Sequence, residues 1–209
     1  MNIEAILGKL EELGTTLGAI AFTCYIFYKT FSAKLEKWLK EERGGVSKSI
    51  TKQSDIDCEI VHEAEKLKEI INADRIEVFE FHNGVHYANG RSALRMSCTY
   101  EVCRYGVEPY LSRLSGIPLT VVPNLIKNLL NKDKVAIEKL DDVADIMPST
   151  FGLLNSMGVK SFYAFVIHND KGEPVGFIAI QFCKDNVTDL QIDGIQRFIW
   201  FIESKLSEM

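Results

Sequence analysis

The chain reads RIEVFEFHNG over residues 75–84, a segment with apolar residues at both parities of a predicted strand. Ile76 and Val78 share one parity, whereas Phe79 and Phe81 have the other. Successive side chains of a strand point to opposite faces, so apolar groups of both parities need cover on both sides. The segment therefore predicts a central strand of a sheet that lies between two layers.

Three further segments predict strands. ALRMSCTYEVC covers residues 93–103, KSFYAFVIHN covers residues 160–169, and EPVGFIAIQFCK covers residues 173–184. The last two are joined by Asp170-Lys171-Gly172, which has the composition of a hairpin turn. Both are apolar on successive residues, so this hairpin is also expected to be covered on its two faces.

Helical patterns surround these strands. Apolar residues recur at intervals of three and four from Asp55 to about Asn72, and again from Ile192 to Leu206. Between residues 104 and 157 the pattern is mixed and includes short helical segments. Two Asn-Gly pairs, at residues 83–84 and 89–90, predict turns. This order of elements predicts an α+β fold with a mostly antiparallel sheet and helices on its faces.

Composition and charge exclude several classes of protein. The 209 residues are 46% hydrophobic and 25% charged, which is typical of a globular chain and not of a disordered one. The net charge is −5, so no overall positive field favours a nucleic-acid partner. The five cysteines form no C-x-x-C pair and are expected to be reduced thiols.

An uncharged apolar stretch lies near the N-terminus, where residues 13–28 read LGTTLGAIAFTCYIFY. As a helix, this stretch spans about 24 Å, and continuing it to Ala33 gives about 31 Å, near the bilayer hydrocarbon thickness of about 30 Å. Basic residues are more frequent after the stretch than before it, which favours a cytoplasmic location for the C-terminal domain. The sequence therefore predicts a single-pass membrane anchor in a lipid bilayer. The residues assigned to the anchor are Leu13, Gly14, Gly18, Phe22, Tyr25 and Tyr28.

Two other interpretations of this stretch remain open, namely a buried core helix and a helix that packs inside an oligomer. Gly14 and Gly18 have the G-x-x-x-G spacing that lets two helices approach closely, which favours a homodimer or a higher oligomer. Gly44-Gly45 and the small polar residues after them predict a linker. The predicted organisation is an apolar N-terminal helix over residues 1–43, a linker over 44–54 and a folded domain over 55–209.

The order of elements and two short motifs resemble a GAF domain. The motifs are F-H-N-G at residues 81–84 and M-S-x-T-Y-E-V at residues 96–102, which resemble a divergent GAF-like group attached to membrane anchors in bacteria and phages. The resemblance covers residues 55–207. It implies a GAF/PAS-like six-stranded antiparallel sheet, here preceded by a long N-terminal helix, with the first and last helices packed together on one face. It also implies a small-molecule pocket on the other face, under a roof of loops and short helices.

The sequence lacks the signature residues of known GAF subgroups. The N-K-x-n-F-x-n-D-E signature of cyclic-nucleotide-binding members is missing, and no cysteine has a context that matches bilin attachment. No P-loop or G-x-G-x-x-G motif indicates ATP or NAD. The sequence therefore predicts no cofactor. His82 and His86 are four residues apart in a turn-rich segment, so a metal site is not expected either.

Polar residues near the ends of the first two predicted strands form the candidate ligand site. Such positions bring polar side chains to a pocket roofed by loops, here for a polar or anionic ligand. An alternative is that His82 and Asn83 only bind backbone groups of the turn, and that Glu101 is a surface carboxylate or pairs with a nearby cation. The candidate ligand-binding residues are His82, Asn83, Tyr87, Arg91, Arg95, Tyr100 and Glu101.

Three functional hypotheses follow. The first is a membrane-anchored, cytoplasm-facing sensory or regulatory module that binds a small ligand or a partner protein and catalyses nothing. The second is a structural or assembly component, of phage origin for example, that uses the GAF-like body as an interaction surface. The third is a small enzyme with His82 and Glu101 as acid and base.

Overall fold

The structure is a computed structural model of the chain. It describes residues 22, 24–32, 34, 50–184, 187, 190 and 192–208. The chain divides into two compact units, Met1–Ser54 and Asp55–Met209.

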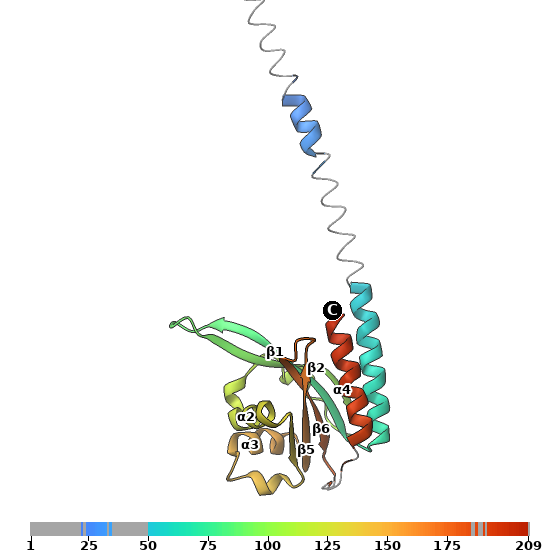
Figure 1. The fold of residues 1–209 in the computed structure, drawn as a ribbon, viewed down its shortest axis with the longest axis vertical. Coiled ribbons are helices and arrows are strands. Elements are labelled where there is room, and N and C mark those ends of the chain that lie inside the picture. Colours follow the sequence, from blue (N-terminus) through green and yellow to red (C-terminus); the bar gives the residue numbers. More distant parts are fainter. Residues whose placement is uncertain are drawn as a thin grey trace, which may run out of the picture. The chain divides into compact units, whose positions relative to one another are not determined.

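Six antiparallel strands form one sheet in the second unit (Figure 1). Their order is β3-β2-β1-β6-β5-β4, so β1 is central and pairs with β2 on one side and β6 on the other. The α+β fold expected from the sequence is confirmed, including the central position of the strand that begins at Arg75. The strands are β1 Arg75–His86, β2 Ser92–Cys103, β3 Ile117–Pro118, β4 Lys134–Ile137, β5 Ser161–His168 and β6 Pro174–Phe182.

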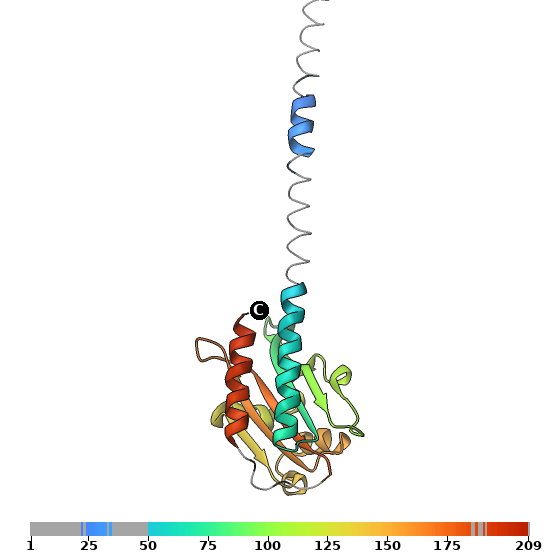
Figure 2. The same ribbon diagram turned by 90° about the vertical axis from the view of Figure 1, so that its right-hand side faces the viewer.

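Two long helices cover one face of this sheet (Figures 1 and 2). They are α4 (Ile192–Ser207) and the helix over residues 50–70, of which residues 55–70 belong to this unit. From Ile56 onward, every third or fourth residue of the first helix is buried against α4 and the sheet. An ion pair of 2.7 Å between Lys205 Nζ and Glu59 Oε2 joins the two helices. This pairing of the first and last helices confirms what the GAF resemblance implies.

Short elements form a roof over the other face of the sheet (Figure 1). Helix α2 begins with Pro123 at its first turn, where a missing N–H costs nothing, and ends at Lys132, which is followed by Asp133 in the left-handed conformation. Met96 and Phe177 on the sheet belong to the same buried cluster as the apolar face of the roof. The roof elements are η1 Leu111–Arg113, η2 Leu119–Val121, α2 Pro123–Lys132, η3 Leu140–Val143 and α3 Pro148–Ser156.

The turn predicted at Asn83-Gly84 is wrong, because β1 continues through these residues to His86. A Cβ on Gly84 would lie 2.4 Å from the carbonyl oxygen of Ala93, so this glycine serves a close approach between two strands and not a turn. The chain reverses at the second Asn-Gly pair, where Gly90 has φ +79°. The β1–β2 hairpin is therefore longer than predicted and extends beyond the roof (Figure 1).

A bulge at Thr99 changes which side chains of β2 share a face. The ladder pairs Val78 with Tyr100 but Phe79 with Cys98, so Thr99 is the extra residue on β2. Cys98 therefore faces the roof, whereas Tyr100 faces the long helices. A prediction from strict alternation along β2 fails at this point.

The predicted membrane anchor falls mainly on residues that the structure does not describe, including Leu13, Gly14 and Gly18. Phe22, Tyr25 and Tyr28 belong to helical residues and are exposed. Among the residues described, no helix is both long and apolar enough to cross a bilayer. The last five residues of the predicted linker, 50–54, are helical, and its residues 44–49 lie outside the described part of the chain.

Candidate functional site

An open groove of about 400 Å³ lies between the β1–β2 hairpin and the roof. Its volume is within the usual range for small-molecule sites. Tyr87 and Arg91, both predicted ligand-binding residues, line this groove, and Lys127 of α2 lines it from the roof. The remaining lining residues are Ser92, Leu94, Leu119, Thr120, Pro123 and Ile126.

The turn of the hairpin places the groove's tyrosine beside its arginine. The backbone N–H of Tyr87 donates to the carbonyl oxygen of Arg91 at 2.9 Å, and the Asn89 side chain accepts from the N–H of Arg91 at 3.1 Å. The Arg91 guanidinium then lies 4.9 Å from the centre of the Tyr87 ring, which is a cation–π distance. The local sequence Tyr-Ala-Asn-Gly-Arg therefore places the Arg91 guanidinium at the groove, where the Tyr87 ring packs against it.

Both charged residues that line the groove are cations, and most of the other lining residues are apolar. Arg91 stands on the hairpin side and Lys127 on the α2 side. An apolar trough with positive groups at its edges is complementary to a ligand with an apolar body and an anionic group. The sequence predicts a polar or anionic ligand here, and that stays a prediction.

Two other predicted residues, His82 and Arg95, lie opposite each other on β1 and β2. Their side chains contact residues of β2 and of the loop before β3. His82 Nε2 lies 2.9 Å from Ser97 Oγ, and Arg95 Nη1 donates to the carbonyl oxygen of Gly116 at 2.5 Å. Ser97 Oγ also accepts from the N–H of Gly116 at 2.8 Å. These bonds attach the loop before β3 to β2, which is a structural use of His82 and Arg95. Asn83 is exposed and pairs with Leu94 in the ladder.

The last two predicted residues are used inside the domain. Tyr100 donates its hydroxyl to Asp57 Oδ1 at 2.6 Å, on the face covered by the long helices. Burial and this contact with Asp57 raise the pKa of Tyr100. Glu101 has a side chain that is only 3% exposed and lies on the roof side. The structure therefore brings Tyr87 and Arg91 together and places His82, Arg95, Tyr100 and Glu101 elsewhere.

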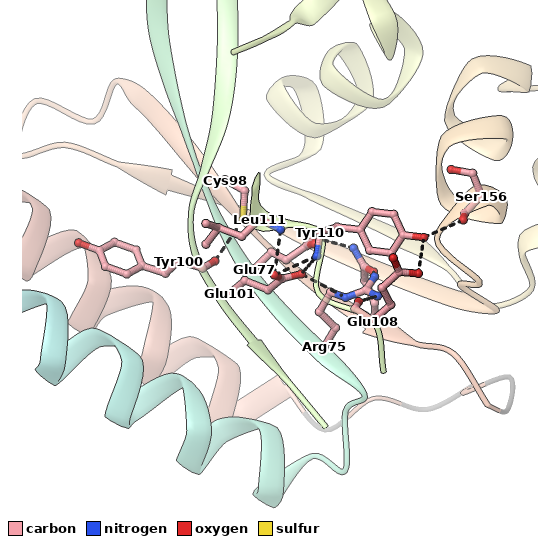
Figure 3. A network of polar contacts seen from close by, with 10 residues as sticks. Arg75, Glu77, Cys98, Tyr100, Glu101, Glu108, Tyr110, Leu111 and Ser156 are labelled. Carbon is pink, nitrogen blue, oxygen red and sulfur yellow. Dashed lines mark hydrogen bonds and ion pairs between the residues drawn. The ribbon is translucent and has the colours of Figure 1, made fainter. Parts of the chain in front are cut away.

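Glu101 fixes the roof to the sheet. Its carboxylate accepts hydrogen bonds from the backbone N–H groups of Tyr110, at 2.8 and 3.0 Å, and Leu111, at 2.9 Å. Its Oε1 also lies 3.4 Å from Arg75 Nε, and the ring of Tyr110 packs 4.9 Å from the Arg75 guanidinium. Figure 3 shows this group between the sheet and the segment that leads into η1.

Arg75, Glu77 and Gln181 continue the polar network across the centre of the sheet. Arg75 Nη1 donates to Gln181 Oε1 at 2.6 Å, and Gln181 Nε2 donates to Glu77 Oε2 at 2.5 Å. Arg75 Nη2 donates to the carbonyl oxygen of Glu108 at 2.6 Å. All three side chains are at most 1% exposed. Polar side chains at such depth are expected only where hydrogen bonds satisfy them.

Two atoms of this network are buried without a hydrogen-bond partner in the described part of the chain, namely Arg75 Nε and Glu77 Oε1. Arg75 Nε has the ion pair with Glu101, whereas Glu77 Oε1 has no such contact among the described residues. Burial raises the pKa of Glu77 to about 8, with Arg75 lowering it and Glu101 raising it by smaller amounts. Glu77 and Gln181 line an internal cavity of about 20 Å³ between sheet and roof, which has room for about one water molecule.

Four residues of the groove and the buried network were not predicted from the sequence, namely Arg75, Glu77, Gln181 and Lys127. A signal for the first two was available, because Arg75 and Glu77 alternate with apolar residues in a strand that is predicted to be buried on both faces. Charged residues at such positions must be paired inside the protein. No comparable signal marks Lys127, because a lysine on an amphipathic helix is usually a solvated side chain.

Comparisons with known proteins address the fold. No protein-family model matches the chain, and no curated protein matches it in sequence. Among solved structures, the blue-light absorbing form of the Thermosynechococcus elongatus PixJ GAF domain is similar, with a TM-score of 0.58 at 12% identity over 76% of this chain and 88% of that one. GAF3 from Slr1393 of Synechocystis sp. PCC6803 has a TM-score of 0.53 at 11% identity, covering 73% and 94% of the two chains.

A far-red cyanobacteriochrome photoreceptor is also similar, with a TM-score of 0.51 at 14% identity over 80% of this chain and 94% of that one. The chain has the fold of a GAF domain. At these levels of identity the similarity concerns the fold alone.

Proposed function

We propose that the chain is a non-catalytic, GAF-like sensory or regulatory module that binds a small amphipathic anion in the groove between the β1–β2 hairpin and α2. The observation that carries the proposal is the groove itself, in which an apolar trough has Arg91 on one side and Lys127 on the other. Its ligand is expected to have an apolar body and a carboxylate or a similar anionic group. The arginine and the lysine would bind the anion, and Leu94, Leu119 and Ile126 would contact the body.

The segment over residues 13–28 is proposed to hold this module at the cytoplasmic face of a membrane, as a homodimer or a higher oligomer. The support for this part is the uncharged apolar stretch, the excess of basic residues after it and the G-x-x-x-G spacing. Alkaline extraction of membranes that contain the full-length protein tests the anchor. An anchored chain stays in the membrane pellet, and recovery in the supernatant would contradict anchoring.

The groove can be tested with a matched pair of probes, 2-naphthylacetate and 2-naphthylacetamide. They share the apolar body, and only the first carries an anionic group. Isothermal titration calorimetry with full-length protein in a non-ionic detergent should show that the carboxylate binds more tightly. Replacement of both cations, in the variant Arg91→Gln/Lys127→Gln, should weaken carboxylate binding at least about tenfold, since charge-assisted hydrogen bonds contribute about 1.5–3 kcal/mol each.

The control variant is Lys171→Gln, which removes an exposed lysine in the β5–β6 turn. It should bind the carboxylate as the wild-type protein does, and detergent partitioning of the probe is the same for all variants. Equal affinity of the carboxylate for the wild-type protein and the double variant would exclude the groove as an anion site.

A further inference from the structure

Glu77 lies at the centre of the sheet and is fully buried. One oxygen, Oε2, accepts a hydrogen bond of 2.5 Å from Gln181 Nε2. The other, Oε1, has no partner among the described residues. A buried group without a partner costs more free energy as an ion than as a neutral acid, so this arrangement favours the neutral carboxylic acid.

The charged neighbours of Glu77 do not balance it. On its own sheet it faces Arg75 of β1 and Glu101 of β2, which is one positive charge for two acidic groups. Arg75 directs its Nη atoms to Gln181 and Glu108, and its Nε to Glu101. The Glu101 carboxylate also accepts hydrogen bonds from the backbone N–H groups of Tyr110 and Leu111. Two thiols also interact with Glu77, those of Cys98 and Cys183, and burial raises the pKa of each.

The roof offers Glu77 no compensating group. The roof residues that line the cavity beside it, from the loop after η1, from α2 and its N-terminal end, and from α3, are all apolar. They are Leu114, Val122, Leu125, Leu153, Leu154 and Met157. An ionised Glu77 under this roof would keep one unmatched negative charge beside a cavity with room for about one water molecule. Full hydration of the carboxylate would require the roof to move away from the sheet.

We propose that Glu77 is a proton-controlled latch for the roof of the domain. Glu77 holds a proton while the roof is closed, as in this structure. It gives that proton to solvent when α2 moves away from the sheet and admits water to the carboxylate. Charge balances in this step, because the neutral acid becomes a carboxylate and the released proton enters bulk water.

Helix α2 connects this latch to the outer groove. Leu125 faces the cavity beside Glu77, whereas Ile126 and Lys127 line the groove. Movement of α2 therefore changes the wall of the groove, so an anion that binds the closed form binds more weakly after Glu77 loses its proton. By reciprocity, a bound anion raises the affinity of Glu77 for its proton. This coupling rests on the proposed function, whereas the latch itself does not.

Carbon-13 NMR of full-length protein labelled at the glutamate carboxyls tests the latch. The wild-type spectrum should contain one carboxyl resonance with a midpoint near pH 8, where burial puts the pKa of Glu77. That resonance should be missing in Glu77→Gln and present in Glu80→Gln, a control on the same strand. If Glu77→Gln does not fold, Glu77→Asp makes the same assignment, because only glutamate is labelled.

Amide exchange, expressed as protection factors, reports the movement. Between pH 7 and pH 9, the protection factors of the α2 amides should fall about tenfold in the wild-type protein. The protection factors of the α4 amides should not change, and neither should those of the α2 amides in Glu77→Gln. The latch is overturned if the Glu77 carboxyl does not titrate between pH 6 and pH 10, or if α2 protection changes equally in wild type and Glu77→Gln.

The coupling to the groove is measured separately, with 2-naphthylacetate as the probe. Its affinity should fall over the same pH range in the wild-type protein and stay constant in Glu77→Gln. A probe that binds with the same pH dependence in both proteins contradicts the coupling and leaves the groove proposal intact. A probe that binds at no pH contradicts the groove proposal, while the carboxyl titration still decides the latch.

Discussion

Leu125 and Ile126 are consecutive residues of α2 that face two different spaces. Leu125 lines the internal cavity beside Glu77, and Ile126 lines the outer groove. A single short helix therefore separates a buried acid from the candidate ligand site. Because the two side chains belong to one backbone segment, a shift of α2 at the cavity is expected to move the residues that line the groove.

The first prediction concerns stability and pH. The pKa of Glu77 is about 8 in the folded chain, above its ordinary value of 4.5, so the folded state binds one more proton than the unfolded state between these pH values. The free energy of unfolding should therefore decrease as pH rises from about 4.5 to about 8, by at most about 1.4 kcal/mol per unit. In Glu77→Gln, which cannot ionise, this contribution is removed. Urea unfolding at several pH values from 5.5 to 8.5 measures both slopes.

Glu80→Gln is the matched control for this measurement, because Glu80 lies on the same strand but is only partly buried. Its slope should equal that of the wild-type protein. Parallel slopes for wild type and Glu77→Gln would show that Glu77 is ionised in the folded state already at pH 6, which is opposite to the expectation from its burial.

The second prediction concerns Glu101→Gln. An amide cannot accept all the hydrogen bonds that the Glu101 carboxylate takes from the η1 segment, so the free energy of unfolding should fall by about 2 kcal/mol. At the same time, one negative charge near Glu77 disappears, which should lower the pKa of Glu77. The pH range over which stability declines should therefore end at a lower pH than in the wild-type protein. A ligand-binding role of Glu101 alone would leave this range unchanged.

The third prediction concerns Tyr100→Phe. The substitution removes the hydroxyl that binds Asp57 and keeps the ring in the core between the sheet and the helices. Stability should fall by about 1–2 kcal/mol, since a hydrogen bond to a carboxylate is lost. Binding of 2-naphthylacetate should not change, because Tyr100 and the groove lie on opposite faces of the sheet. Calorimetry and urea unfolding of one preparation separate the two effects, and weaker probe binding would contradict the placement of Tyr100.

Much of this fold was predictable because its determinants are local or periodic. The strand from Arg75 is apolar at both parities and therefore had to be central, and the periodic apolar residues of the first and last helices predicted their burial. The Asn83-Gly84 turn was wrong for a reason of packing. An Asn-Gly pair occurs in turns, but a glycine is also needed where two strands approach closely. Only the position of the Ala93 carbonyl oxygen in the folded chain shows that the second reason applies to Gly84.

The candidate site was less predictable, because it depends on register and on contacts between distant segments. The bulge at Thr99 turns Tyr100 away from the face of Cys98, and no feature of the sequence marks that bulge. Lys127 lines the same groove as Arg91 only because α2 lies on the side of the groove opposite the hairpin. Local sequence did predict the neighbourhood of Tyr87 and Arg91, since the Asn89-Gly90 turn between them fixes their separation.

The last prediction compares two glycines. A Cβ on Gly176 of β6 would lie 2.0 Å from the carbonyl oxygen of Phe79, a backbone atom of β1 that cannot move without disturbing the ladder. Gly176→Ala should therefore destabilise the domain by about 1–3 kcal/mol or more. A Cβ on Gly152, in helix α3, meets nothing within 4 Å, so Gly152→Ala should stabilise it by about 0.5–1 kcal/mol. Urea unfolding of both variants measures these opposite signs, and a neutral Gly176→Ala would contradict the close contact between β1 and β6 on which the position of Glu77 depends.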